Sequence, residues 1–154
     1  MKQKKQILSA SKIKTFESCS WKFWCNYFLH LPQESNDGAR RGTVCHLIFE
    51  LLVDPRHKNH FDLIVSSSSL SGSEAIARLV RKALKREEGY SEENYLLCEE
   101  MILIGLNNDF YGSKGIVNSP EKEFLLENKK PEYKIRGFID KPIEYEKKLK
   151  IVDY

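Results

Sequence analysis

The stretch that decides how this chain folds is Tyr133-Lys-Ile-Arg-Gly-Phe-Ile-Asp-Lys-Pro-Ile-Glu-Tyr-Glu-Lys-Lys-Leu-Lys-Ile-Val-Asp-Tyr154. Two runs rich in β-branched and aromatic residues flank a short charged break, and this pattern predicts an antiparallel hairpin. If the turn centres on Glu146 and Lys147, position 140 pairs with position 153. Asp140 and Asp153 would then share one face of the hairpin, with their Cβ atoms roughly 5 Å apart.

Two carboxylates at this separation repel each other unless positive charge lies between them. A hard divalent cation such as Mg²⁺ or Mn²⁺ favours oxygen ligands and would remove the conflict. The alternative interpretation is a solvated hairpin whose acidic side chains line up by chance. The spacing of Asp140 and Asp153 is compatible with both interpretations.

Helical patterns dominate the sequence before the hairpin. The stretch Ser9-Ala10-Ser11 predicts the N-cap of a helix that we expect to run to about Leu29. Its apolar residues recur at helical spacing and are mostly aromatic: Ile13, Phe16, Phe23, Trp24, Tyr27 and Phe28. Such a stripe can stack on nucleic-acid bases, but a stripe at helical period more often packs into a core, and we favour the core.

A second helix is predicted from about Arg40 to Leu52, after a polar loop at residues 35–41 and before Pro55. Thr43, His46 and Glu50 are three and four residues apart, so they share one face of this helix. A histidine in such a position is usually structural or exposed. A role of His46 as a metal ligand does not follow from this helical spacing alone.

The middle of the chain offers fewer functional signals. Residues 54–72 look irregular, and we expect His57 and His60 to lie at the surface. A capping box formed by Ser71 and Glu74 predicts the start of a helix. That helix carries the basic residues Arg78, Arg81, Lys82, Lys85 and Arg86, which could follow DNA phosphates but more often form a solvated face. A further helix is expected from Ser91 to about Leu106, and strands from about residue 119 onward.

The overall composition is that of an ordinary globular protein. The 154 residues are 41% hydrophobic and 31% charged, with a net charge of +3, which does not by itself indicate nucleic acid. We predict one domain, with a helical part at about 9–110 and the start of a sheet at about 119–154. No run approaches a membrane span and no signal peptide is apparent, so we expect a cytoplasmic protein without a membrane partner. The four cysteines lack Cys-x-x-Cys spacing and are expected to be reduced thiols.

Several motifs together resemble the PD-(D/E)XK nucleases. They are Gly137-Phe138-Ile139-Asp140, then Ile151-Val152-Asp153-Tyr154, and Gly42-Thr43-Val44-Cys45-His46 earlier in the chain. They are most similar to the RecB/AddB-like branch, which includes the CRISPR-associated RecB-like exonucleases. The resemblance covers nearly the whole chain. It implies an α/β fold with a restriction-endonuclease-like core, in which helices flank a mixed sheet built around a central hairpin.

The resemblance also implies a set of site residues. His46, Asp140 and Asp153 would hold Mg²⁺ or Mn²⁺, together with a glutamate from the preceding strand. Glu121 and Glu123 both fit, and we favour Glu121 because Glu-x-x-Phe is the commoner form of the motif. The family places a lysine directly after the position of Tyr154, where this sequence stops. We therefore expect either a chain cut within its catalytic motif, with the C-terminal part of the fold missing, or a chain that cannot do the chemistry as given, and we favour the former.

Some relatives bind a [4Fe–4S] cluster through one N-terminal cysteine and three later ones. Cys19 lies where the first would be, although a serine follows it in place of the usual proline. Since relatives without clusters share this segment, we favour a protein without the cluster.

The activity implied by the resemblance is hydrolysis of DNA by an exonuclease in recombination, repair or phage or CRISPR processing. The alternatives are an inactive nuclease fold that binds DNA or acts as a scaffold beside a helicase, and an unrelated interaction domain.

Overall fold

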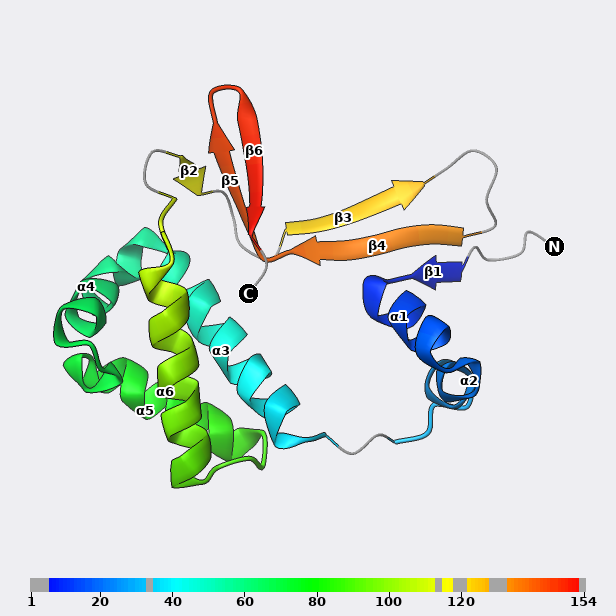
Figure 1. Cartoon of the computed structure of the whole chain (residues 1–154), viewed down its shortest axis with the longest axis horizontal. Coiled ribbons are helices and arrows are strands. Elements are labelled where there is room, and N and C mark those ends of the chain that lie inside the picture. The colour runs from blue at the N-terminus through cyan, green and yellow to red at the C-terminus, as the bar shows by residue number, and fades with distance from the viewer. Residues whose placement is uncertain (1–5, 33–34, 113–114, 118–121, 128–132, 153–154) are drawn as a thin grey trace. The chain divides into compact units, whose positions relative to one another are not determined.

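The computed structural model describes residues 6–32, 35–112, 115–117, 122–127 and 133–152. The chain divides into two compact units, Met1–Glu34 with Glu121–Ile139, and Ser35–Pro120 with Asp140–Tyr154. We call them unit 1 and unit 2. The predicted α/β class is confirmed, because helices and two small sheets make up the fold (Figure 1).

Unit 1 begins with strand β1 (Gln6–Leu8) and two short helices, α1 (Ala10–Ser18) and α2 (Ser20–Tyr27). The predicted N-cap is confirmed, since Ser9 accepts a hydrogen bond from the Lys12 amide. The prediction of a single long helix is wrong. Cys19 takes an extended conformation and separates α1 from α2. The Cys19 sulfur then caps α2 by accepting from the Lys22 amide at 3.4 Å.

The sheet of unit 1 has the order β1-β4-β3, with β3 at Lys122–Glu127 and β4 at Tyr133–Ile139. Strand β4 lies in the centre, parallel to β1 and antiparallel to β3. Gly137 faces Phe124 across the β3–β4 pair. A Cβ at residue 137 would lie 2.5 Å from the Phe124 ring. Only glycine therefore leaves room for this ring to lie over β4.

Unit 2 is mostly helical (Figure 1). Helix α3 (Asp37–Val53) and helix α6 (Glu92–Asn107) pack against each other, and α4 (Lys58–Ser67) and α5 (Glu74–Arg86) complete the group. Two short 3₁₀ turns, Pro55–His57 and Leu70–Gly72, flank α4. The core consists of buried side chains from all four helices, including Val44, Ile48, Leu52, Ile64, Val80, Leu84, Cys98 and Ile102.

The prediction for residues 54–72 was wrong, because most of this segment is helical. Helix α4 ends at Ser67, and Ser68 takes a left-handed conformation with φ 51°. The predicted cap of the next helix was also misplaced, since Ser73 rather than Ser71 accepts the hydrogen bond from the α5 backbone. The predicted helix from Ser91 is confirmed, with Ser91 as its N-cap.

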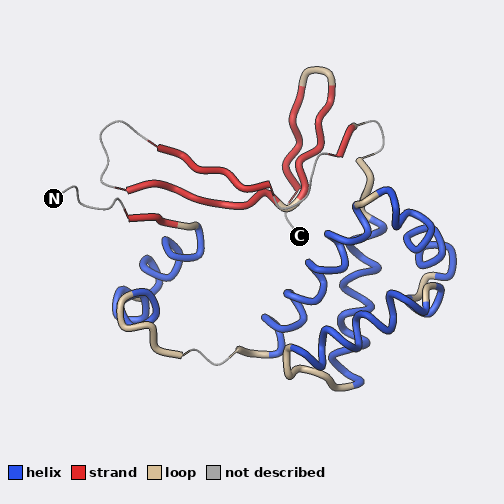
Figure 2. The backbone as a smooth tube through the Cα atoms, turned by 180° about the vertical axis from the view of Figure 1, so that it is seen from behind, coloured by secondary structure: helices blue, strands red, loops and turns tan. Residues whose placement is uncertain are grey.

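The sheet of unit 2 has the order β2-β5-β6, with β2 at Ile116–Val117, β5 at Lys141–Tyr145 and β6 at Lys148–Val152. The predicted hairpin is confirmed, because β5 and β6 pair antiparallel and Tyr145 faces Lys148 across the turn. Figure 2 shows it as a twisted two-stranded ribbon. The apolar run from Tyr133 to Tyr145 is not one strand, however, since it bends at Asp140 and enters a second sheet.

The interpretation of the aromatic stripe as core was wrong. None of the residues of α1 and α2 is buried, and Phe16, Trp24 and Phe28 are among the exposed large side chains. Their helical spacing places them on a common surface, as expected, but in this chain that surface remains open.

Gly72 provides a test of the packing of the 3₁₀ turn Leu70–Gly72 against α4. A Cβ at this position would lie 2.4 Å from the Leu63 carbonyl oxygen, and this backbone atom cannot rotate away. We expect Gly72→Ala to lower the free energy of unfolding by about 1–3 kcal/mol, measured by urea denaturation. Gly42→Ala is the matched control, because its Cβ meets nothing within 4 Å and alanine favours helix α3. Equal stability of Gly72→Ala and the wild type would contradict this packing.

Candidate metal site

Two of the predicted ligands come together in unit 2. The Nδ1 atom of His46 lies 3.6 Å from Oδ2 of Asp140. His46 belongs to α3, and Asp140 occupies the bend directly before β5. The Asp140 side chain is only 12% exposed, whereas the His46 side chain is 40% exposed. The contact therefore has one sheltered carboxylate and one imidazole that solvent can reach.

Helix α3 explains the position of His46. Val44, Cys45, Ile48 and Phe49 are buried in the core, so this side of the helix faces inward. Thr43 and Glu50 are exposed and His46 is half-buried, which places His46 at the border of the buried face. The predicted sharing of one face by these three residues agrees with this burial pattern.

Strand β5 fixes the other half of the pair. Lys141 and Ile143 are both buried, with 1% and 0% of their surface exposed. The Lys141 ammonium donates a hydrogen bond to the Phe110 carbonyl oxygen at 2.9 Å and lies 4.6 Å from the centre of the Phe110 ring. Since Phe110 follows the end of α6, Lys141 ties the start of β5 to the helical core beside Asp140.

Sequence reasoning missed Lys141. Burial lowers its pKa from 10.5 to about 8, and the nearby charge of Lys150 adds to that effect, while Asp109 opposes it. The alternation of side chains along a strand places Lys141 on the same side as the apolar Ile143. This was the only indication in the sequence that Lys141 would be buried.

An apolar pocket of about 420 Å³ lies beside the pair. His46 and Lys141 contribute its charged or ionisable groups, and the remaining wall comes from α3, α6, the turn after α6, and β6. The lining residues are Gly42, Cys45, His46, Phe49, Met101, Ile104, Gly105, Asn108, Lys141 and Val152. Gly105 keeps the two helices close, because a Cβ there would lie 2.4 Å from the Phe49 ring.

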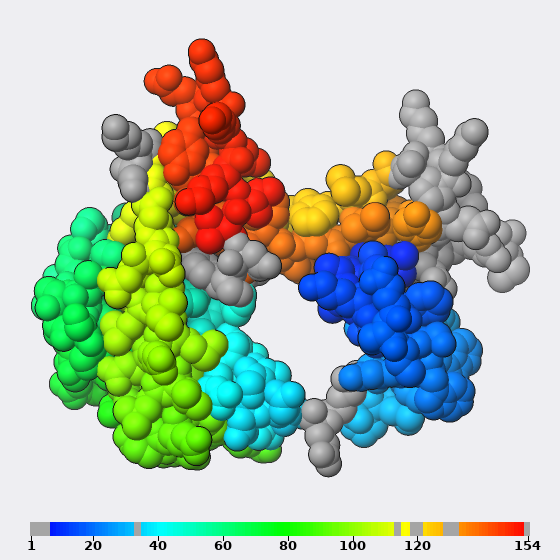
Figure 3. All heavy atoms as spheres, viewed as in Figure 1, coloured from blue at the N-terminus to red at the C-terminus, as the bar shows by residue number. Residues whose placement is uncertain are grey.

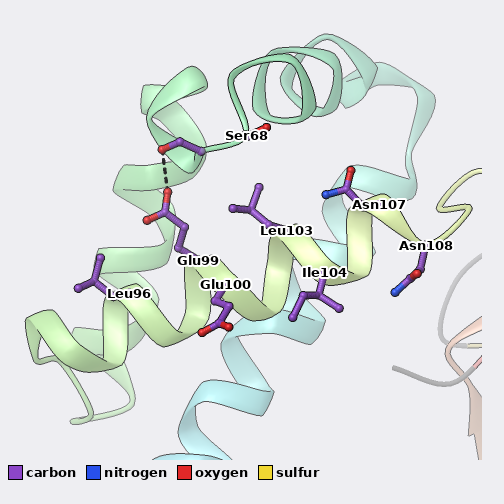
Figure 4. A pocket seen from close by; sticks show the side chains of 9 residues that line it. Ser68, Leu96, Glu99, Glu100, Leu103, Ile104, Asn107 and Asn108 are labelled. Carbon is purple, nitrogen blue, oxygen red and sulfur yellow. Dashed lines mark hydrogen bonds between the residues drawn. The ribbon is translucent and has the colours of Figure 1, made fainter.

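A second, more open pocket borders α6 on the side of Ser68 and Leu103 (Figure 4). Its main acidic group, Glu99, accepts hydrogen bonds from the Ser69 hydroxyl at 2.7 Å and from the Leu70 amide at 2.8 Å. Both bonds hold the 3₁₀ turn against α6. Glu99 therefore has a structural role, and we do not place chemistry in this pocket.

The other predicted site residues are distributed as follows. Asp153 and Glu121 lie outside the described residues. Glu123 lies on β3 in unit 1 and forms an ion pair with Arg136 at 2.6 Å. Cys19 is exposed between α1 and α2, and its assignment to a cluster stays a prediction.

His60 differs from expectation. Its Nδ1 atom lies 2.8 Å from the hydroxyl of Ser73, so it supports the start of α5.

The donor atoms present fit a divalent cation. Ligands that share one octahedral ion at about 2.1 Å lie about 3 Å apart, so the His46–Asp140 separation of 3.6 Å needs only a small adjustment. Imidazole nitrogen with carboxylate oxygen suits Mn²⁺ well. Within the described ranges, no three His, Cys, Asp or Glu side chains gather as a metal-holding group. Within the described residues, His46 and Asp140 thus bring two donor groups of suitable chemistry together.

None of the helices in the described residues is both long and apolar enough to cross a membrane.

Comparison with known proteins gives a family. The model of the PD-(D/E)XK nuclease superfamily matches residues 7–154. A search of curated proteins and a search of solved structures found no match. The match extends over the elements that carry His46 and Asp140. The chain therefore belongs to the PD-(D/E)XK nuclease superfamily, whose members are in general nucleases that use Mg²⁺ or Mn²⁺.

Proposed function

We propose that residues 1–154 belong to a single nuclease domain of the RecB/AddB-like branch and that it hydrolyses DNA as a metal-dependent exonuclease. The observation that carries the proposal is the contact between His46 and Asp140. Asp140 ends the Gly137-Phe138-Ile139-Asp140 motif and His46 ends the Gly42-Thr43-Val44-Cys45-His46 motif. The two motifs are far apart in sequence, and a solvated hairpin would not require them to meet.

In the proposed site, His46 and Asp140 hold the cation together with Asp153 and Glu121. A bound cation of this kind polarises the scissile phosphate and lowers the pKa of an attacking water. Asp140 supplies a negative charge that is largely sheltered from water, which strengthens its attraction for a cation. His46 must be neutral to offer its Nδ1 lone pair. Lys141 keeps the start of β5 against α6 and so keeps Asp140 beside α3.

The activity can be tested with DNA substrates of different ends. We expect an end-labelled linear strand to be degraded with Mn²⁺ or Mg²⁺, and a closed circular strand to resist cutting, when the assayed protein includes the lysine that the family places after Tyr154. EDTA should stop the reaction. Cutting of the circle at the same rate would replace the exonuclease proposal with an endonuclease. Binding of DNA without cutting of either substrate would instead favour the inactive scaffold beside a helicase.

The role of His46 predicts a preference between metals. Imidazole binds Mn²⁺ more readily than Mg²⁺, so we expect faster cutting with Mn²⁺. Because loss of residues that merely orient ligands already weakens metal binding by about 10–100-fold, His46→Ala should weaken Mn²⁺ binding at least as much. Calorimetric titration with Mn²⁺ measures this directly.

Glu50→Gln is the matched control, because Glu50 is exposed on the same helix one turn from His46. Equal wild-type rates with the two ions, together with unchanged Mn²⁺ affinity in His46→Ala, would remove His46 from the ligand set.

A further inference from the structure

An exposed aromatic surface lies on α1 and α2, in unit 1, whereas His46 and Asp140 belong to unit 2. Trp21 is 70% exposed, Phe16 56%, Trp24 46% and Phe28 44%. Figure 3 draws the atoms of these helices in blue. Large aromatic side chains gathered on one exposed surface usually mark a binding site.

The rings of this surface are held in place by their neighbours. Phe23 is half-buried and lies 5.4 Å from Phe16, 5.1 Å from Tyr27 and 5.9 Å from Phe28, measured between ring centres. Trp24 and Phe28 stack at 4.5 Å with 15° between their planes. Because these contacts restrict the rings of Phe16, Trp24 and Phe28, these side chains lose little freedom when a ligand stacks on them.

The charge of the same two helices is positive. Lys12, Lys14 and Lys22 lie on them, and Glu17 is their only acidic residue. Lys14 and Lys22 are exposed. Lys12 donates to the Ile7 carbonyl oxygen and lies 5.3 Å from the centre of the Tyr27 ring. Exposed aromatic rings and exposed lysines on the same two helices match the two parts of a single nucleic-acid strand, its bases and its phosphates.

The basic face of α5 is a weaker candidate for the same role. Arg78 and Arg86 are already paired with Glu74 and Glu87. Arg81 lies over the ring of Tyr95, which is buried, so this ring offers no free face to a base. That helix has positive charge but no exposed stacking surface of its own.

We propose that α1 and α2 form a binding surface for single-stranded DNA, in which Trp21 and Trp24 stack on bases while Lys14 and Lys22 contact phosphates. The surface lies in unit 1, whereas His46 and Asp140 lie in unit 2. Binding at this surface requires no metal. The choice of DNA rests on the proposed nuclease function, but the stacking does not depend on the metal ligands.

The protein carries its own probe of this proposal. Trp21 and Trp24 are the two tryptophans of the chain, so intrinsic fluorescence reports on this surface alone. Titration of the whole chain with an oligothymidylate in EDTA should quench that fluorescence, and a duplex of equal length should quench it less. Raising the salt concentration should weaken binding, because phosphate contacts release counterions.

Substitutions separate stacking from charge. Trp24→Ala should weaken binding by about five- to a hundredfold, the range for loss of one base–aromatic stack, and Trp24→Phe should recover most of it. Lys22→Glu should weaken binding and reduce the salt dependence. Tyr133→Ala is the matched control, since Tyr133 is an exposed aromatic residue of the same unit outside the two helices. A fluorescein-labelled strand reports binding by anisotropy for every variant.

Each outcome decides the matter. Unchanged affinity in folded Trp24→Ala and Lys22→Glu would overturn the proposal. Self-association of the wild type that Trp24→Ala abolishes, without DNA binding, would identify the surface as a contact between copies and also overturn it. Loss of cutting in Asp140→Asn with full retention of quenching would support both proposals. Quenching without any cutting by the wild type would leave the surface intact and reject the nuclease activity.

Discussion

Asp140→Asn is expected to reduce metal-dependent DNA cleavage by about 10³-fold or more. The substitution keeps the shape of the side chain but removes the negative charge that would hold the cation. Stabilisation of transition-state charge by a bound metal is worth several kcal/mol, and each 1.36 kcal/mol corresponds to about tenfold in rate. Asp140 is 12% exposed and adjoins His46, so solvent cannot replace its carboxylate easily.

The measurement is the rate of degradation of an end-labelled strand with Mn²⁺ and with Mg²⁺. Asp62→Asn serves as the control, because Asp62 is an exposed carboxylate of α4 that pairs with Lys58. Circular dichroism of both variants verifies that the helices of unit 2 persist. If Asp140→Asn cuts within about tenfold of the wild type, the His46–Asp140 pair is not the metal site.

Lys141→Met is expected to change how stability depends on pH. The folded pKa of Lys141 is about 8, below the ordinary value of 10.5, because the ammonium is buried. Between these values the unfolded chain binds more protons than the folded one, so stability rises with pH in this window. Below pH 8 the folded protein carries the full cost of the buried charge, about 3 kcal/mol.

Methionine fills a similar volume without charge, but it loses the hydrogen bond to the Phe110 carbonyl oxygen, worth about 1 kcal/mol. Lys141→Met should therefore be more stable than the wild type by about 2 kcal/mol at about pH 7. Near pH 10.5 the difference should vanish or reverse sign.

Urea denaturation in EDTA, followed by the helical signal, measures the free energy of unfolding at each of the two pH values. Lys148→Met, at an exposed lysine of the same hairpin, should show no such change. A constant difference at all pH values would contradict the buried charge.

Local patterns predicted much of the fold. The turn at Glu146 and Lys147 and the alternation around it gave the correct register of the hairpin. The spacing of apolar residues predicted both α3 and α6. Pro55 marked where the first should end, and Ser91 marked where the second should begin. Helix α4 was missed because its serines suggested a loop. In the structure, the hydroxyls of Ser66 and Ser67 donate back to the Leu63 carbonyl oxygen within the last turn.

The candidate site was predictable only where a sequence motif marks it. His46 and Asp140 meet as the resemblance implied, although nothing in either segment alone requires the contact. Lys141 was not predictable in the same way, because its burial depends on Phe110, which belongs to a distant turn. The open aromatic surface was missed for a related reason. Helical spacing shows which residues share a face, whereas burial depends on what the rest of the chain places against that face.

The parallel pairing of β1 with β4 has a consequence for synthesis of the protein. Residues Gln6–Leu8 of β1 pair with Tyr133–Ile135 of β4. Strand β1 therefore emerges from the ribosome long before β4 is synthesised. The helices of unit 2 all lie within residues 37–107, so they can pack against one another while translation continues. Unit 1 can be completed only after β4 emerges. Until then, β1 has no strand partner, and we expect chaperones to engage the chain at this stage.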